Sequence, residues 1–298
     1  MPQTHPPIII VTGPTSSGKS DLAVQMAQQI NAEIISADSR QVYRGMDIGS
    51  GKITSREMQG IPHHLIDIQN PKVEYNVSHF LHDVTGAIQA IEGRGKRVII
   101  CGGTTFWIEA LLFGITLPTV PPDKAFRAKW GLKSKSELMG YLKRLDPERA
   151  KTVDSNNRVR ILRAIEIAKT LGKVPTLALS SFNAERFFII GLNPPVEVLN
   201  QKIRTRLKAR MKAGMLDEVK KLNQSGVSYE RLESFGLEYR ALTKHLQGKL
   251  SLEEVNETLP YDIIHYAKRQ RSSLRRLEKR GAVIHWVENS EQALKLVA

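Results

Sequence analysis

Apolar residues gather in short β-branched runs, separated by stretches in which they recur every three or four positions. Three strand-like runs precede residue 105, at 8–11, 33–36 and 98–101. Helix-period sequence lies between them at 21–30 and 77–92. Strands that alternate with helices predict right-handed crossovers and an α/β fold, a parallel sheet covered on both faces.

A fourth strand-like run, at 187–192, follows only after a long polar interval. The interval opens with a proline-rich stretch at 117–123, which cannot continue a helix and predicts a linker. From 124 to 170 the pattern is helical and basic, with 12 Lys or Arg against 5 Asp or Glu between 123 and 163. Asp146-Pro147 predicts a helix start, with proline at the first helical position.

The interruption of the strand pattern predicts the domain organisation. We expect a core made of residues 1–117 and 186–298, with a helical subdomain at 118–185 inserted into it. After residue 195 the chain is mostly helical again, with a short strand predicted at 283–287.

The first strand-like run leads directly into the pattern G-x-x-x-x-G-K-S and then into helical sequence. The glycines let successive N–H groups point inward, Lys19 adds a positive charge, and the Ser20 hydroxyl is placed to ligate Mg²⁺. This strand–loop–helix setting predicts a P-loop NTPase-like core in which a glycine-rich loop binds a di- or triphosphate. The loop residues are Gly13, Pro14, Thr15, Ser16, Ser17, Gly18, Lys19 and Ser20.

The carboxylate that NTP-hydrolysing enzymes use at the end of a neighbouring strand is missing from its usual place. The third run ends in Gly102-Gly103-Thr104, which disfavours a motor or switch ATPase. Asp38 follows the second run instead, and the carboxyl ends of adjacent parallel strands line one crevice. We therefore expect Asp38, Thr104 and the glycine-rich loop to converge. There Asp38 could ligate Mg²⁺, act as a general base, or simply cap a turn.

The charge of the chain indicates a polyanionic partner. Its 298 residues include 44 Lys or Arg and 30 Asp or Glu, a formal net charge of +14. Such a field concentrates nucleic acid most simply, although charge alone does not separate RNA from DNA or from an acidic membrane. Two helices carry much of it, at 202–212 and 268–280, and either could also be only a solvated basic face.

Other features exclude several classes of protein. Cys101 is the single cysteine, so a disulfide within the chain and a cysteine-based zinc site are excluded. His63-His64 is a poor metal pair, because adjacent side chains on a strand or loop point apart. No apolar stretch approaches 18 residues, and the first strand starts too early to leave room for a targeting peptide. We expect a cytoplasmic monomer with no membrane segment and no obligate protein partner.

Five motifs, in this order, resemble those of the tRNA dimethylallyltransferases, of the bacterial type without a C-terminal zinc finger. They are Gly-Pro-Thr-Ser-Ser-Gly-Lys-Ser (13–20), Asp-Ser-Arg-Gln-Val-Tyr (38–43), Gly-Met-Asp-Ile-Gly (45–49), Pro-His-His-Leu-Ile-Asp (62–67) and Gly-Gly-Thr (102–104). The resemblance extends to 146–147, 158–166, 206–214 and 268–270, and so covers nearly the whole chain. These enzymes isopentenylate the exocyclic amine of the adenosine next to the anticodon.

The resemblance implies a particular use of the glycine-rich loop. The loop would hold the pyrophosphate of dimethylallyl diphosphate, which accounts for the missing acid and disfavours the ATP-binding role that the motif suggests by itself. Lys19, Thr104 and Arg206, with Mg²⁺ near Ser20, would stabilise the leaving pyrophosphate. Asp38 would accept a proton from the adenine amine.

The resemblance also implies which residues contact tRNA. The target adenine must be flipped out of its stack to reach the crevice, and the inserted subdomain would close on the anticodon stem-loop. The implied contact residues are Asp38, Ser39, Arg40, Gln41, Thr104, Arg127, Val159, Arg160, Ile161, Leu162, Arg163 and Gln270.

Departures from the family pattern at Trp107, Leu237 and Ser273 affect the expected walls of the prenyl and RNA sites more than the chemistry. Two alternatives stay open. An adenylate isopentenyltransferase would share the core but needs no RNA-sized basic surface. A P-loop small-molecule or nucleoside kinase with an inserted lid is disfavoured by the pairing of 38–41 with 102–104.

Overall fold

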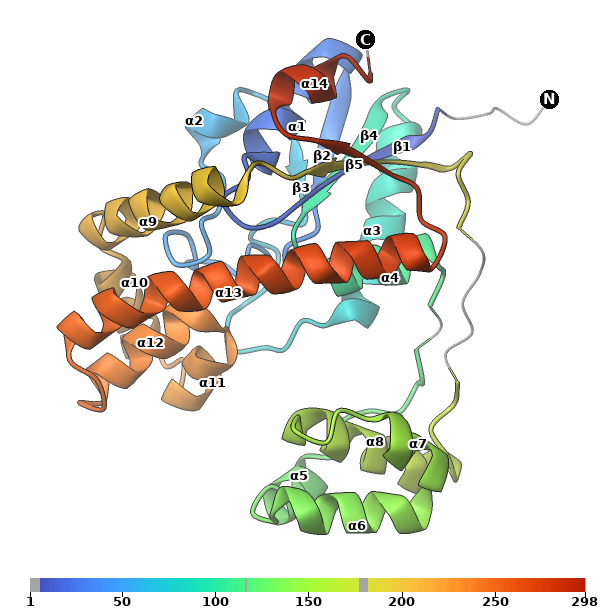
Figure 1. Cartoon of the computed structure of the whole chain (residues 1–298), viewed down its shortest axis with the longest axis vertical. Coiled ribbons are helices and arrows are strands. Elements are labelled where there is room, and N and C mark those ends of the chain that lie inside the picture. The colour runs from blue at the N-terminus through green and yellow to red at the C-terminus, as the bar shows by residue number, and fades with distance from the viewer. Residues whose placement is uncertain (1–5, 116, 177–181, 298) are drawn as a thin grey trace. The chain divides into compact units, whose positions relative to one another are not determined.

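Within the described residues, six strands form one parallel sheet in the computed structural model, which describes residues 6–115, 117–176 and 182–297 (Figure 1). The sheet order is β3-β2-β4-β1-β5-β6, and every pairing is parallel, which confirms the predicted α/β fold. The strands are β1 (Ile8–Thr12), β2 (Ala32–Ser36), β3 (His63–His64), β4 (Arg97–Gly102), β5 (Phe187–Leu192) and β6 (Ile284–Val287).

The central strand β1 (IIIVT) is β-branched throughout, because both faces of the sheet are covered there. In β1, Ile9 and Val11 pack on one face into a core shared with α1 (Lys19–Ile30), while Ile8 and Ile10 are equally buried on the other. Helices α1 and α14 (Ser290–Leu294) lie on the first face (Figure 1). Helices α3 (Val77–Glu92) and α4 (Thr105–Leu112) lie on the opposite face.

Two short elements were not predicted. The two-residue strand β3 pairs through Ile34 with His63 and through Ile35 with His64, so four strands, not three, precede residue 105. Helix α2 (Ser55–Met58) is a single turn that Thr54 and Glu57 close with a capping box. Elements this short leave no apolar period in the sequence: α2 is held by its own cap, and β3 by pairing with the distant strand β2.

After β5 the chain continues into a group of helices that pack on one another. They are α9 (Val196–Lys212), α10 (Met215–Gln224), α11 (Tyr229–Ser234), α12 (Leu237–Leu246) and α13 (Leu252–Lys279). Helix α13 contacts α9, α12 and α4, and therefore connects this group to the helices that cover the sheet.

The chain divides into two compact units, Met1–Phe113 with Ser181–Ala298, and Gly114–Ser180. The sequence places the insert at 118–185, of which residues 177–181 lie outside the described part. The second unit is helical and has its own core, built on Leu138, Leu142 and Ile161. Its helices are α5 (Lys124–Trp130), α6 (Lys135–Leu145), α7 (Pro147–Thr152) and α8 (Arg158–Leu171), and Asp146 caps α7 as predicted.

In the described part of the chain, every helix is too short or too polar to cross a lipid bilayer.

Candidate active site

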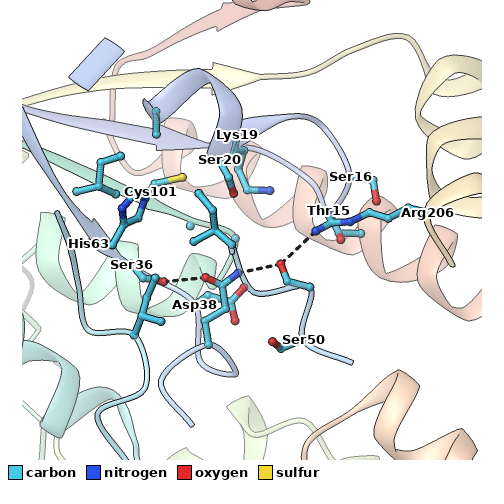
Figure 2. A pocket seen from close by; sticks show the side chains of 18 residues that line it. Thr15, Ser16, Lys19, Ser20, Ser36, Asp38, Ser50, His63, Cys101 and Arg206 are labelled. Atoms are coloured by element: carbon cyan, nitrogen blue, oxygen red, sulfur yellow. Dashed lines mark hydrogen bonds between the residues drawn. The ribbon is translucent and has the colours of Figure 1, made fainter. Parts of the chain in front are cut away.

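A cleft of about 590 Å³, partly open to solvent, lies where β1, β2 and β4 end. The loop after β1 contributes Lys19 and Ser20, the segment after β2 contributes Asp38, and α9 contributes Arg206 (Figure 2). The predicted convergence of the strand ends is therefore present in the structure.

The glycine-rich loop takes its shape from two positions without side chains. Gly13 lies against β5, where a Cβ would come within 2.3 Å of the Leu192 carbonyl oxygen, and Gly18 caps α1 in the left-handed conformation. Lys19 Nζ folds back and donates to the Pro14 carbonyl oxygen over 2.8 Å. Burial lowers the pKa of Lys19 to about 8, and the negative charge of Asp38 opposes part of that shift.

Asp38 is held in a turn that joins the ends of β2 and β4. Its Oδ1 accepts a hydrogen bond from the Arg40 backbone N–H at 2.9 Å, and Thr104 Oγ1 accepts one from the Ser39 N–H at 3.0 Å. Gly102 allows this closeness, because a Cβ there would come within 2.2 Å of the Ala37 carbonyl oxygen. Gly102, at the strand end where NTP-hydrolysing enzymes carry an acidic residue, is therefore required for the close approach of β4 to Ala37.

A chain of hydrogen bonds crosses the cleft from β2 to α9 (Figure 2). Ser36 Oγ donates to Gln41 Oε1 at 3.4 Å, and Gln41 Nε2 donates to the Gly51 carbonyl oxygen at 3.4 Å. Arg206 Nη2 donates to the same carbonyl oxygen at 3.1 Å. Both Gln41 and Arg206 are therefore oriented by the backbone of Gly51, which no sequence pattern identified as part of the site.

Gln270 forms hydrogen bonds to the backbone inside the protein. Its side chain is buried, its Oε1 accepts from the Thr15 N–H at 2.8 Å, and its Nε2 donates to the Gly103 carbonyl oxygen at 2.9 Å. Helix α13 thereby ties the glycine-rich loop to the end of β4. These bonds give Gln270 an internal role and occupy the Thr15 amide, while its contact with tRNA stays a prediction.

Arg40 is anchored in a similar way. Its Nε donates to the Phe235 carbonyl oxygen at the end of α11, and its Nη1 donates to the Ser39 carbonyl oxygen at 3.2 Å. These bonds fix the guanidinium beside Ser39, next to the Asp38 turn.

One wall of the cleft is apolar. It is formed by Ala23, Ile34, Ile53, Ile66 and Cys101, with His63 beside them. Burial raises the pKa of the Cys101 thiol to about 12 and lowers that of His63, so both are neutral near pH 7. His64 turns to Glu33 instead, with 2.7 Å between His64 Nε2 and Glu33 Oε2. Neither the resemblance at 62–67 nor the His63-His64 pair indicated a cleft wall.

The donor set suits Mg²⁺. Ser20 and Asp38 offer a hydroxyl and a carboxylate oxygen in the same cleft, and Mg²⁺ takes one or two such ligands together with phosphate oxygens and water. Among the described residues no group of three or more His, Cys, Asp or Glu side chains could form a metal cage.

The remaining candidates lie in the unit Gly114–Ser180 and fall into two kinds. Val159 and Arg160 are exposed at the start of α8, whereas Ile161 and Leu162 are buried in the core of the unit. The side chains of Ile161 and Leu162 therefore lie away from any surface that RNA could reach.

Arg127 and Arg163 are engaged with the buried carboxylate of Glu166. Arg127 Nε donates to Glu166 Oε1 at 2.7 Å and its Nη2 donates to Oε2 at 2.9 Å. Arg163 Nη2 donates to the Val120 carbonyl oxygen at 2.7 Å, and its Nη1 lies 3.4 Å from Glu166 Oε2. Both arginines therefore stabilise the unit itself, which motif spacing could not reveal.

Comparison with known proteins gives consistent results. The sequence profile of the IPP transferase family matches residues 41–277. The tRNA dimethylallyltransferase 2 of Shewanella sediminis (strain HAW-EB3) is 41% identical over 295 residues, 98% of this chain and 97% of the relative. The crystal structure of the full-length tRNA isopentenylpyrophosphate transferase from Bacillus halodurans matches with a TM-score of 0.72 at 31% identity, over 98% of this chain and 94% of that one. A eukaryotic dimethylallyltransferase acting on tRNA matches with a TM-score of 0.77 at 25% identity, over 97% of this chain and 75% of that one.

Proposed function

The chain belongs to the IPP transferase family, and we propose that it transfers a dimethylallyl group from dimethylallyl diphosphate to tRNA. The acceptor is the exocyclic N6 amine of the adenosine on the 3′ side of the anticodon, and pyrophosphate is released. The observation that carries this proposal is the shared cleft, in which Asp38 faces the glycine-rich loop next to an apolar wall.

The apolar wall and the loop divide the cleft into two parts suited to the two ends of the donor. The diphosphate would lie against the loop amides, Lys19 and Arg206. The dimethylallyl group would lie near Ile34, Ile53 and Ile66, where it leaves water.

The reaction joins the adenine nitrogen to the first carbon of the donor. The N6 lone pair forms the new C–N bond while the C–O bond breaks, and the electron pair of that bond leaves with the pyrophosphate. Asp38 orients the amine and takes its proton as the new bond forms. Lys19, Arg206 and the loop N–H groups stabilise the charge that builds on the leaving oxygen.

Ser20 would hold Mg²⁺ against the diphosphate, and the ion would neutralise part of the charge of the leaving group. Thr104 acts one step away from the reacting atoms, because its hydroxyl holds the Ser39 backbone beside Asp38. We propose it as a positioning residue in this reaction.

The tRNA contacts proposed for the two units differ in kind. In the larger unit, Asp38, Ser39 and Arg40 form the turn that a flipped adenine would meet. In the unit Gly114–Ser180, Val159 and Arg160 are exposed to the anticodon stem-loop, and Arg127 and Arg163 keep 33% and 31% of their side chains exposed. The net charge of +14 supports a nucleic-acid substrate.

The test is incubation of the purified protein with dimethylallyl diphosphate, Mg²⁺ and an unmodified tRNA that carries adenosine 3′ to its anticodon. Digestion to nucleosides and mass spectrometry should detect N6-dimethylallyladenosine, and a transcript with guanosine at that position should stay unmodified. Prenylation of AMP but not of tRNA would replace the proposal with an adenylate isopentenyltransferase, and phosphate transfer from ATP would replace it with a kinase.

A further inference from the structure

The loop at residues 47–51 is held by a carboxylate that lies outside the cleft. Glu218 of α10 accepts hydrogen bonds from three successive backbone N–H groups, at 2.8 Å from Asp47, 2.6 Å from Ile48 and 2.9 Å from Gly49. Three consecutive amides that point to one place form an anion-binding concavity. Here the chain supplies the anion itself.

The carbonyl groups of the same loop are held by Arg210 of α9. Its Nε donates to the Ile48 carbonyl oxygen at 2.5 Å, and its Nη2 donates to the Gly49 carbonyl oxygen. Arg210 Nη1 also pairs with Glu238 Oε1 at 3.2 Å. Side chains from the helices after β5 thus bind both the N–H groups and the carbonyl groups of the loop backbone.

Tyr239 of α12 completes the attachment. Its hydroxyl donates to Glu218 Oε1 at 2.8 Å, and its buried ring lies against Gly49 so closely that a Cβ there would come within 2.5 Å of it. The loop therefore has little freedom to shift while Glu218 and Tyr239 remain in place.

The position of this loop decides where two cleft residues point. The Gly51 carbonyl oxygen, two residues after Gly49, accepts from both Arg206 and Gln41. Arg206 lies one helical turn before Arg210 on α9, so the loop and the two arginines form one connected assembly.

We propose that Glu218 is a positioning residue: by holding the 47–51 loop it aligns Arg206 on the diphosphate of the prenyl donor and keeps Gln41 in place in the same cleft. This inference rests on the proposed function for the identity of the donor, but not for the presence of a diphosphate site. Loss of the carboxylate releases three amides at once and lets the Gly51 carbonyl oxygen move away from Arg206. A shift of about 1 Å in a charged group at a reacting centre costs on the order of 100-fold in rate.

The experiment compares Glu218→Gln with Asp217→Asn, a matched change at the preceding position. Asp217 has a side chain 66% exposed, and within the described residues its ion pair is with Lys220, at 3.5 Å, across one helical turn. In Glu218→Gln one amide oxygen replaces two carboxylate oxygens, so it cannot satisfy three N–H groups and the Tyr239 hydroxyl. Gly49→Ala disturbs the attachment of the loop to Tyr239 from the loop side, because the added Cβ would clash with the Tyr239 ring.

Four quantities are measured in the full-length protein: hydrogen exchange of the 47–49 amides, the dissociation constants for inorganic pyrophosphate and for tRNA, and single-turnover prenyl transfer to tRNA. We expect Glu218→Gln and Gly49→Ala to speed the exchange, weaken pyrophosphate binding about tenfold and slow transfer about 10- to 100-fold. The dissociation constant for tRNA should change by less than about threefold, and Asp217→Asn should match the wild type in every measurement.

A double variant distinguishes positioning from simple destabilisation. If Glu218 acts through Arg206, adding Glu218→Gln to Arg206→Ala should slow transfer little further, whereas an unrelated loss of stability would add in full. Faster amide exchange with unchanged pyrophosphate binding and turnover would overturn the inference, as would unchanged exchange. If the wild type transfers no prenyl group, the proposed function fails, and the pyrophosphate comparison still decides the role of Glu218.

Discussion

At the scale of single residues, Asp38 carries the most specific expectation. In Asp38→Asn the side-chain oxygen can still accept from the Arg40 N–H, so the turn is preserved, but the amide cannot take a proton. Single-turnover prenyl transfer should fall about 10²- to 10⁴-fold, while the dissociation constant for tRNA stays near that of the wild type. A transfer rate close to normal would remove the proposed role as general base.

Lys19 should make donor binding sensitive to pH. Burial lowers the pKa of its ammonium group to about 8, so the free protein loses this positive charge as the pH rises through that value. A bound diphosphate favours the charged form, and above pH 8 binding therefore has to take up a proton. The dissociation constant of dimethylallyl diphosphate should be nearly constant between pH 7 and 8 and then rise by up to about tenfold per pH unit.

Calorimetric titration at fixed Mg²⁺ and without RNA measures this profile. A phosphate ester loses its last proton at about pH 6, so the donor itself does not titrate between pH 7 and 9. Lys19→Ala is the comparison: it should bind the donor more weakly and show a flat profile. An equal slope in wild type and variant would assign the titration to another group.

Residue types and spacing in the sequence predicted which side chains line the cleft. They did not predict the hydrogen-bond partners of the other candidate residues. The G-x-x-x-x-G-K-S pattern and Asp38 could be interpreted from local sequence, because the chemistry of a phosphate loop depends on adjacent residues. Gln270 could not, since its contacts with Thr15 and Gly103 join positions at least 167 residues apart. Arg127 is similar, because its partner Glu166 lies 39 residues away and looks in the sequence like any helical glutamate. Arg163 lies three residues before Glu166, but its bond to the Val120 carbonyl oxygen spans 43 residues.

At the scale of elements, long helices and strands could be predicted from the sequence, whereas very short elements and the order of the strands could not. The predicted strand at 187–192 coincides with β5, and the helix at 77–92 coincides with α3, because each leaves a clear apolar period. The two-residue β3 and the one-turn α2 leave none. The position of β4 between β1 and β2 is likewise absent from the local pattern, because strand order is decided by contacts between distant segments.

Helix α8 offers a matched pair of arginines for separating binding from stability. Arg160 is exposed, whereas Arg163 donates to the Val120 carbonyl oxygen and lies beside the buried Glu166. Arg160→Ala should weaken tRNA binding without changing the thermal midpoint. Arg163→Ala should instead lower the free energy of unfolding by about 1–3 kcal/mol, since it removes a partner of buried acceptors.

Filter binding to an anticodon stem-loop RNA and thermal denaturation of each variant measure these effects. Binding of dimethylallyl diphosphate serves as the control and should stay unchanged in both. A lower midpoint in Arg160→Ala, or an unaltered RNA affinity, would argue against its proposed contact with the stem-loop.

At the scale of the whole molecule, the basic residues have two roles: some stabilise the fold in ion pairs, and the rest give the molecule its excess positive charge. Glu33, Glu109 and Glu166 are buried and hold arginines in ion pairs, so part of the basic content stabilises the fold. Carboxylates balance only 30 of 44 Lys and Arg residues, which leaves the formal net charge of +14. Composition predicted this excess, but only the structure separates the arginines that hold helices together from those at a surface.

The excess charge predicts how tRNA binding responds to salt. Each phosphate neutralised by Lys or Arg releases condensed counterions, so the affinity for tRNA should fall about 20- to 150-fold between 50 and 200 mM salt if three or four phosphates are contacted. Dimethylallyl diphosphate offers a single diphosphate group to a partly enclosed cleft, and its affinity should fall much less over the same range. Dissociation constants for both ligands at several concentrations of monovalent salt give the two slopes of log K against log salt. A tRNA slope no steeper than that of the donor would mean that the basic surface of this protein is a solvated face and that recognition of the stem-loop depends on the bases near Asp38.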